Sequence, residues 1–253
     1  DLLVQAGLQE TISYSLVSKA LLEQVGAAGY GKPEPLQTVN PMSREQEYVR
    51  TSLRGTILRN AAVGLRQPPG TVAIFEIGRI FIPREGDLPE EQERVVGVVS
   101  GSRGDSLWHK DAPALDFYEA KGAVQMVLQR LGLTPTFERG TDDMLHPGRT
   151  AHILANGRDV GVVGELHPRI LSGFDFSNDT VVLFEMDIDA IANETQWLRH
   201  RFAAFSRYPS AERDLALVVD LSVTAEQLQS TIENHPLVVR VALFDIFEGE
   251  GLP

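Results

Sequence analysis

The clearest feature of the hydrophobic pattern is a predicted helix from Asp116 to Leu131. Its apolar residues recur every three or four positions, which is typical of a helix with one buried face: Phe117, Ala120, Val124, Val127, Leu128 and Leu131. Asp116 and Glu119 have the spacing of a capping box, and Gly132 follows the last residue as a helix terminator. This stretch predicts a helix packed along one side against a core.

Two further helices are predicted in the first third of the chain. One runs over 18–26, with Ser18 as its N-cap and Gly26 at its end. The other runs over 44–65, with its best periodicity at Leu53, Ile57, Leu58 and Ala61. Pro68-Pro69-Gly70 would end it, because proline cannot continue a helix.

Apolar runs between these helices predict the strands of a sheet. They cover 36–39, 72–82, 95–99 and 180–188, and a hairpin joins 150–155 to 160–166 through Asn156-Gly157, a typical type I′ turn. Pro168 then stands where a first helical turn tolerates proline. The 72–82 run is apolar on both faces, as in a central strand.

The pattern changes after about residue 200. Residues 213–219 and 238–247 predict strands, and between them Thr224 and Gln227 cap a helix that ends near Asn234. This βαβ order is the opening half of a ferredoxin-like split βαβ unit. In that arrangement a third strand lies between the two, so we expect an incomplete unit with an open position in its sheet. The whole chain is predicted to be α+β.

Composition restricts the function further. The chain has 253 residues, no cysteine and a formal net charge of -12, which excludes disulfides and argues against nonspecific nucleic-acid binding by most of the surface. No apolar run is long enough to cross a membrane, and no signal-peptide pattern is present. Both ends fall within predicted structure, so we expect an internal piece of a longer cytoplasmic protein.

One stretch is basic within this acidic chain. Arg199, His200, Arg201, Arg207 and Arg213 are opposed only by Glu212. A solvated interdomain linker and a nucleic-acid contact both explain such a cluster.

Several side chains are candidates for chemistry. His146, His152, Glu165 and His167 are of the types that bind zinc or iron, which leaves metal-assisted hydrolysis by the His146–His167 region as an alternative function. Their spacing matches no helix-borne ligand pair, and both His-Pro sequences also fit turns. No serine-nucleophile elbow and no phosphate-binding loop is present.

Carboxylates offer a second set of candidates. Asp142 with Asp143, and Asp187 with Asp189, lie at element ends, where capping explains them better than acid–base catalysis. Glu76 lies inside an apolar strand and must find a cation, because an unpaired buried charge is costly. Its candidate partners are Arg50, Arg54 and Arg79.

Eight segments, in this order, are together similar to the beta subunits of bacterial phenylalanyl-tRNA synthetases. They are GLQETISYS (7–15), NPMS (40–43), YVRTSL (48–53), FEIGRIF (75–81), DFYEAKG (116–122), HPGRTA (146–151), GVVGELHP (161–168) and YPSAERDL (208–215). The resemblance spans essentially the whole chain. It implies a noncatalytic core in residues 1–200, with a class II synthetase-like antiparallel sheet and flanking helices. Residues 201–253 would be the first half of a ferredoxin-like anticodon-binding domain.

The resemblance also implies a role within a larger enzyme. Such a subunit docks on a catalytic alpha subunit in a two-alpha, two-beta assembly and helps position tRNA(Phe) for ATP-dependent phenylalanylation. The glycine-rich segment ending in arginine that binds ATP in class II enzymes is missing, as are the family's editing and magnesium-binding modules. We therefore expect ATP and magnesium in the whole enzyme, no cofactor in this chain, and no catalysis by the chain alone.

Site residues follow from these expectations. The candidates for tRNA binding are Arg201, Arg207 and Arg213. The candidates for structural or interface roles are Arg50, Arg54, Glu76, Lys121, His146, Glu165 and His167. The surface facing the alpha subunit is predicted to include 2–8 and 49–65, with simple coverage of the sheet as the alternative.

Overall fold

A computed structural model describes residues 1–26, 34–103, 113–176, 180–195, 207–220 and 222–246. The chain divides into two compact units, a larger one of residues 1–200 and a smaller one of residues 201–253. Each unit is described by itself below.

The larger unit is built on a seven-stranded sheet. Its order is β1 (Gln9–Glu10), β4 (Val72–Ile82), β5 (Glu90–Ser100), β9 (Val181–Asp187), β8 (Arg158–Leu166), β7 (Leu145–Ala155) and β6 (Pro135–Arg139). All neighbours are antiparallel except β1 and β4, which are parallel. A separate two-stranded sheet pairs β2 (Leu16–Val17) with β3 (Tyr48–Val49).

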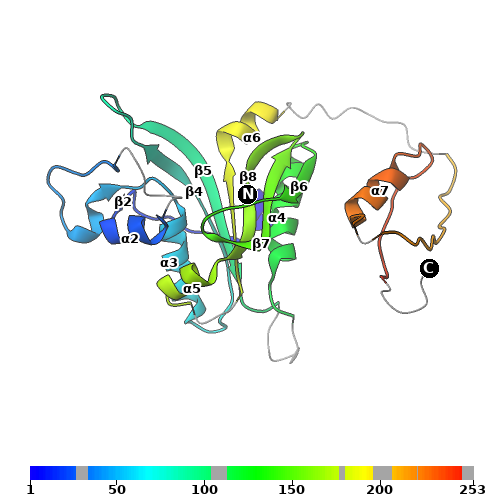
Figure 1. Ribbon diagram of the computed structural model, residues 1–253, viewed down its shortest axis with the longest axis horizontal. Helices are drawn as coiled ribbons and strands as arrows, with labels where there is room; N and C mark the ends of the chain where they lie inside the picture. Colours follow the sequence, from blue (N-terminus) through cyan, green and yellow to red (C-terminus); the bar gives the residue numbers. More distant parts are fainter. Residues whose placement is uncertain (27–33, 104–112, 177–179, 196–206, 221, 247–253) are drawn as a thin grey trace. The chain divides into compact units, whose positions relative to one another are not determined.

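Helices cover both faces of the large sheet (Figure 1). One face carries α4 (Phe117–Arg130), which contacts β5, β8 and β9, together with α1 (Leu2–Gln5) and α6 (Ile188–Glu194). The other carries α3 (Arg54–Leu65), which contacts β4 and β5, together with α2 (Lys19–Gln24) and α5 (Pro168–Gly173). The sheet therefore separates two hydrophobic cores.

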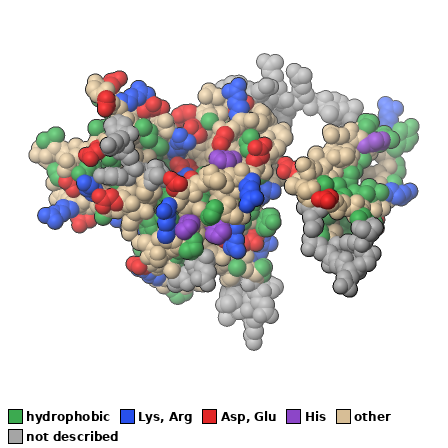
Figure 2. Space-filling view, in the orientation of Figure 1, with side chains coloured by type: hydrophobic (Ala, Val, Ile, Leu, Met, Phe, Trp, Pro, Cys, Tyr) green, Lys and Arg blue, Asp and Glu red, His purple; other side chains and the backbone are tan. Residues whose placement is uncertain are grey.

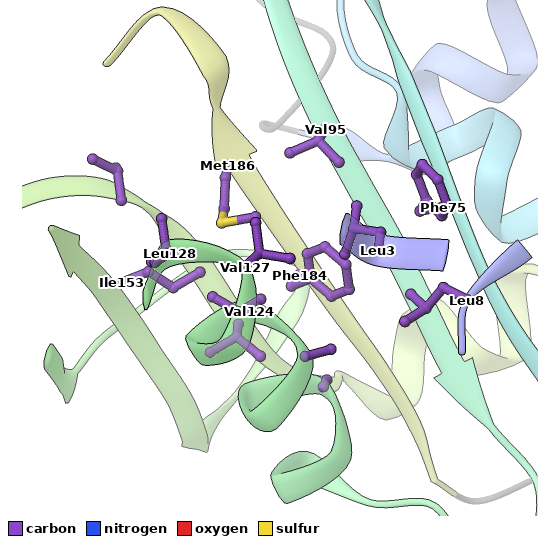
Figure 3. Packing of buried hydrophobic residues seen from close by; sticks show 14 of the residues in the cluster. Leu3, Leu8, Phe75, Val95, Val124, Val127, Leu128, Ile153, Phe184 and Met186 are labelled. Atoms are coloured by element: carbon purple, nitrogen blue, oxygen red, sulfur yellow. The ribbon is translucent and has the colours of Figure 1, made fainter. Parts of the chain in front are cut away.

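The first core lies under α4 and α1. Figure 3 shows Val124 and Val127 of α4 directed toward Phe184 and Met186 of β9, with Leu3 beside them. Gly97 of β5 lies opposite Phe184 and leaves room for its ring, because a Cβ at this position would stand 2.2 Å from the Phe184 Cζ atom. The absence of a side chain at Gly97 therefore allows the Phe184 ring to pack against β5.

The second core lies under α3. Ile57 and Leu58 of this helix are fully buried and pack in one cluster with Val96, Val98 and Leu183 of the sheet. Alternate residues of β5 therefore serve opposite cores, which explains why this strand is apolar on both faces.

The structure confirms the turn and capping signals. Ser18 Oγ accepts from the Leu21 backbone N–H, and Asp116 and Glu119 form the complete capping box of α4. Asn156 and Gly157 both have positive φ, 51° and 83°, as a type I′ hairpin requires. Pro168 is the first residue of α5.

The predicted helix over 44–65 is wrong in its first half. Residues Arg44–Gln46 form a short 3-10 helix, η2, Tyr48–Val49 is strand β3, and α3 begins only at Arg54. Backbone hydrogen bonds to distant segments override the helical side-chain pattern here. The backbone N–H groups of Val49 and Arg50 donate to Leu36 O and Ser15 O. The predicted strand over 36–39 is reduced to one bridge between Gln37 and Tyr48.

In the smaller unit the predicted helix is present and the two predicted strands are not. Helix α7 (Ala225–Glu233) has the capping box of Thr224 and Gln227, whereas 213–219 and 238–246 form no strand; residue 247 lies outside the described residues. A strand needs a neighbouring strand to form hydrogen bonds with its backbone N–H and C=O groups. In a split βαβ unit these two strands flank a third one, and the described part of the smaller unit supplies no strand between them. Leu215, Val218, Leu243 and Phe244 are consequently exposed.

Among the described residues, no helix combines the length and the apolar character that a membrane span requires.

We expect Gly97→Ala to destabilise the larger unit by about 1–3 kcal/mol, because the new methyl group would overlap the Phe184 ring in a packed core. Urea unfolding measured by circular dichroism checks this. Gly122→Ala in α4 is the matched control: its Cβ would meet nothing within 4 Å, so stability should stay equal or rise by up to about 1 kcal/mol. Equal unfolding curves for the Gly97→Ala variant and the parent would contradict this packing.

Candidate functional site

Arg54 forms the most extensive ion-pair network on the α3 side of the sheet. It is the first residue of α3 and is buried. Its Nη1 donates to both carboxylate oxygens of Asp142 at 2.9 and 2.8 Å, and its Nε donates to Glu185 Oε2 of β9. Asp142 also accepts from the Met144 backbone N–H at 2.9 Å. The guanidinium thus joins α3, β9 and the turn before β7.

The charges around Arg54 fix its protonation. Burial alone would lower the pKa of Arg54, but the carboxylates of Glu185 and Asp142 raise it above the ordinary arginine value. Both Nη1 and Nε of the guanidinium are thus bonded to carboxylates of the chain itself.

Arg50 and Glu76 form a second buried pair. Arg50 Nη1 lies 2.7 Å from Glu76 Oε1, and its Nε donates to the backbone oxygen of Arg79 at 2.9 Å. Gly78 makes room for this guanidinium, because a Cβ there would stand 2.4 Å from Arg50 Nη2. Of the three partners considered for Glu76, the structure selects Arg50, and Arg79 pairs instead with Glu91 at the surface.

Arg94 completes the set on this face of the sheet. Val96 of β5 pairs with Glu76 of β4 on one side and with Glu185 of β9 on the other. Because Arg94 lies two residues before Val96 on the same strand, its side chain is on the same face of the sheet as those of Glu76 and Glu185. Its Nη1 lies 3.1 Å from Asp187 Oδ2, and Asp187 also caps α6 by accepting from the Ala190 backbone N–H.

These three arginines face four carboxylates, those of Glu76, Asp142, Glu185 and Asp187. Each guanidinium has a carboxylate partner within the chain, although Nε of Arg94 has no hydrogen-bond partner, and the formal charges of the seven groups sum to one negative charge. This largely buried cluster disfavours a polyphosphate, which needs unpaired cations.

Of the three histidines singled out in the sequence, His146 and His167 serve turns, whereas His152 of β7 has its Nδ1 2.9 Å from Asp159 Oδ2. His146 Nδ1 accepts from the Gly148 backbone N–H at 3.1 Å, and His167 Nδ1 accepts from the Arg169 backbone N–H at 3.2 Å, where it caps α5. Glu165 pairs with Arg149 at 2.5 Å. Within the described ranges, no three histidine or carboxylate side chains are placed to hold a metal ion. The hydrolase alternative finds no support.

A shallow cavity of about 340 Å³ adjoins the Arg54 network. Its lining residues are Thr141, Asp142, Asp143, Leu145, Pro147, His167 and Arg169. Its arginine is also bonded within the chain, because Arg169 Nη2 donates to the backbone oxygen of Asp143.

The other candidates lie elsewhere. Lys121 of α4 stands on the opposite face of the sheet, with its Nζ 4.8 Å above the Phe137 ring. Arg207 and Arg213 are exposed in the smaller unit, where Arg213 Nη1 donates to Glu212 O, and Arg201 lies outside the described residues. On the face shown in Figure 2, acidic and basic side chains are interspersed.

Sequence reasoning did not pair Arg54 with Glu185, and it gave Arg94 no role. Glu185 carried the same signal as Glu76, since it is a lone carboxylate in the apolar run Val181–Met186. A rule that every such carboxylate needs a buried cation would have pointed to it. Asp142 was expected to cap an element end, and it does accept a bond from a backbone N–H, but its ion pair depends on a contact 88 residues away.

Comparison with known families decides where the chain belongs. Residues 1–188 match the family described as "Phenylalanyl tRNA synthetase beta chain CLM domain", and residues 206–253 match the "Ferredoxin-fold anticodon binding domain". The chain belongs to the phenylalanyl-tRNA synthetase beta chain family.

Curated relatives agree with this assignment. The chain is 36% identical to the phenylalanine–tRNA ligase beta subunit of Dehalococcoides mccartyi over 96% of its length, covering 30% of that protein. It is 37% identical to the Bacillus subtilis beta subunit over 98% of its length, covering 31% of that protein. The chain thus spans about 30% of the length of these beta subunits.

A solved structure supports the fold. A pyrrolysyl-tRNA synthetase from Desulfitobacterium hafniense superposes with a TM-score of 0.53 at 14% identity, over 76% of this chain and 64% of that one. The antiparallel sheet with flanking helices is therefore the class II synthetase-like architecture expected of the beta chain family.

We expect Arg54→Met to destabilise the protein by about 3 kcal/mol, because it leaves the partly buried carboxylates of Asp142 and Glu185 without their cation. Arg66→Met is the matched control at the end of the same helix. Arg66 is exposed and lies 4.0 Å from Asp175, so its loss should change stability by less than about 1 kcal/mol. Chemical denaturation of both variants checks this, and equal losses would refute a central role for the Arg54 network.

Proposed function

We propose that this chain is a noncatalytic scaffold of a phenylalanine–tRNA ligase. It docks on the catalytic alpha subunit of a two-alpha, two-beta assembly and helps hold tRNA(Phe) for phenylalanylation in the cytoplasm. ATP and magnesium act in the whole enzyme. In this proposal residues 1–200 are the synthetase-like core, and residues 201–253 are the first half of the anticodon-binding domain.

The observation that carries the noncatalytic part is the internal pairing of Arg50, Arg54 and Arg94. Forming an aminoacyl adenylate gathers negative charge on the α-phosphate, which class II enzymes neutralise with guanidinium groups. Here the guanidiniums over the sheet are paired with carboxylates of the chain itself, and the surplus charge is negative. The class II sheet is retained, while its arginines stabilise the fold.

Phenylalanine-dependent exchange of pyrophosphate into ATP tests the absence of catalysis. We expect the purified chain to show background exchange only, while a complete phenylalanine–tRNA ligase assembly, as the positive control, exchanges rapidly. Exchange by the chain that requires phenylalanine and rises with chain concentration would overturn the proposal.

The tRNA contact is proposed for Arg201, Arg207 and Arg213. Their support is the exposure of Arg207 and Arg213 and the match of residues 206–253 to an anticodon-binding domain. Exposed arginines bind RNA through its phosphates, and such binding weakens as salt rises. Because the chain as a whole is acidic, we expect weak binding.

Changing all three to alanine should lower the affinity for tRNA(Phe) and flatten its dependence on salt. The slope of log affinity against log salt should fall by up to about 2–3, roughly 0.7–0.9 for each phosphate that an arginine no longer neutralises. The matched control changes Arg130, Arg139 and Arg158, which are exposed in the larger unit, and removes the same charge. Fluorescence anisotropy with labelled tRNA measures both, and identical slopes for the two triple variants would contradict the assignment.

A further inference from the structure

The described part of the smaller unit leaves most of its large apolar side chains in contact with water. They lie in the two segments on either side of α7, and between 44% and 88% of each is exposed: Leu215, Leu217, Val218, Val219, Val239, Leu243, Phe244 and Ile246. On α7 itself Leu228 and Ile232, four positions apart on one face, are partly buried. Exposed apolar residues gathered in this way mark a binding surface.

The backbone of the two segments lacks the pairing that their sequence predicts. Residues 213–219 and 238–246 form no strand, and among the described residues no backbone hydrogen bond joins one segment to the other. A ferredoxin-like sheet separates these two strands by a third one, which bonds to both. Unpaired N–H and C=O groups beside exposed apolar side chains are a template for pairing with another chain.

A second copy of the unit has the order of elements that the open position requires. The complete ferredoxin-like fold is one βαβ unit followed by another, so its second half repeats the order strand, helix, strand. Two copies related by a twofold axis therefore each insert one strand between the two strands of the other. The result is an antiparallel sheet of four strands, two from each copy, with both α7 helices on one face.

The composition of the segments indicates which strands lie at the centre of this sheet. The run Leu215–Val219 contains no charged residue, whereas Arg240 and Asp245 interrupt 238–246. A central strand is covered more completely than an edge strand, and charges are tolerated at an edge. The 213–219 strands of the two copies are therefore placed side by side at the centre, and the 238–246 strands at the two edges.

The first segment is self-complementary in this arrangement. Side chains of a strand alternate between faces, and both helices lie on one face, so odd-numbered residues stand opposite odd-numbered ones and even opposite even. Full overlap of 213–219 places Ala216 opposite its own copy and Leu215 opposite the second copy's Leu217. The small side chain thus lies on the twofold axis, and an apolar pair on each side of it stabilises the contact.

We propose that the chain forms a symmetric dimer through its smaller unit, in which each copy fills the open sheet position of the other. This inference rests on the proposed assignment of residues 201–253 as the first half of a ferredoxin-like domain. The chain carries a net charge of -12, which opposes association of two copies in general. The uncharged run Leu215–Val219 is a part of the surface where two copies approach without that repulsion.

Cysteine cross-linking tests the geometry, because the chain itself has no cysteine. Ala216→Cys places a thiol on the twofold axis, with a Cα separation between the copies of about 4.5–5.5 Å, which a disulfide spans. Ala242→Cys is the matched control, since Ala242 is also an exposed alanine and its two copies lie on the outer strands, about 14–15 Å apart. Under mild oxidation, Ala216→Cys should form the covalent dimer at least about tenfold faster on non-reducing gels.

Sedimentation of the complete chain supplies the second measurement. The parent should be a dimer that dissociates on dilution, and Ala216→Pro should be a monomer, because proline removes a backbone N–H at the centre of the paired strands. Ala216 lies outside the larger unit, so the variant should keep the melting temperature of that unit.

Three results would overturn the inference. They are a parent chain that stays monomeric from micromolar to millimolar concentration, an Ala216→Pro variant that is as dimeric as the parent, and equal cross-linking of the two cysteine variants. The proposed function is judged separately. A monomeric parent that binds tRNA(Phe) leaves that function standing, and a dimeric parent that does not bind tRNA(Phe) contradicts the function and leaves the dimer in place.

Discussion

The fold depends on pairing the buried carboxylate of Glu76 and the partly buried carboxylate of Glu185 with arginines on the α3 side of the sheet. Glu76 and Glu185 interrupt two otherwise apolar strands, and each would be costly to bury alone. Arg50, just before α3, and Arg54, its first residue, supply the cations and thereby fix where that helix meets β4, β5 and β9. The same pairs order two loops, since Arg50 binds the 13–15 segment and Arg54 binds Asp142.

The cohesion of the sheet and the proposed absence of catalysis both rest on this one arrangement. A guanidinium whose charge is already matched by a carboxylate of the chain neutralises a phosphate less well, so each arginine that ties the helix to the sheet is less suited to ATP chemistry. The chain keeps the class II architecture, and its charged residues are used for internal cohesion. The proposed scaffold role needs this cohesion, because a scaffold must present its contacts to other molecules in a fixed geometry.

Sequence patterns predicted the structure correctly where the interacting residues are close together in the chain. The α4 capping box, the Ser18 cap, the Asn156-Gly157 turn and Pro168 all depend on neighbours within a few residues, and all are confirmed. Elements that depend on distant partners were predicted less well. Residues 44–53 leave the helix because β3 pairs with β2, and 213–219 forms no strand because a strand needs a partner. For the same reason the sequence indicated that Glu76 needs a cation but could not choose Arg50 among three arginines.

If Arg54 is committed to Asp142 and Glu185, it does not serve a nucleotide. Calorimetric titration of magnesium-ATP into the purified chain and its Arg54→Met variant tests this most directly. The account predicts no saturable binding to either protein at millimolar nucleotide. Saturable binding to the parent chain that disappears in a folded Arg54→Met variant would contradict it.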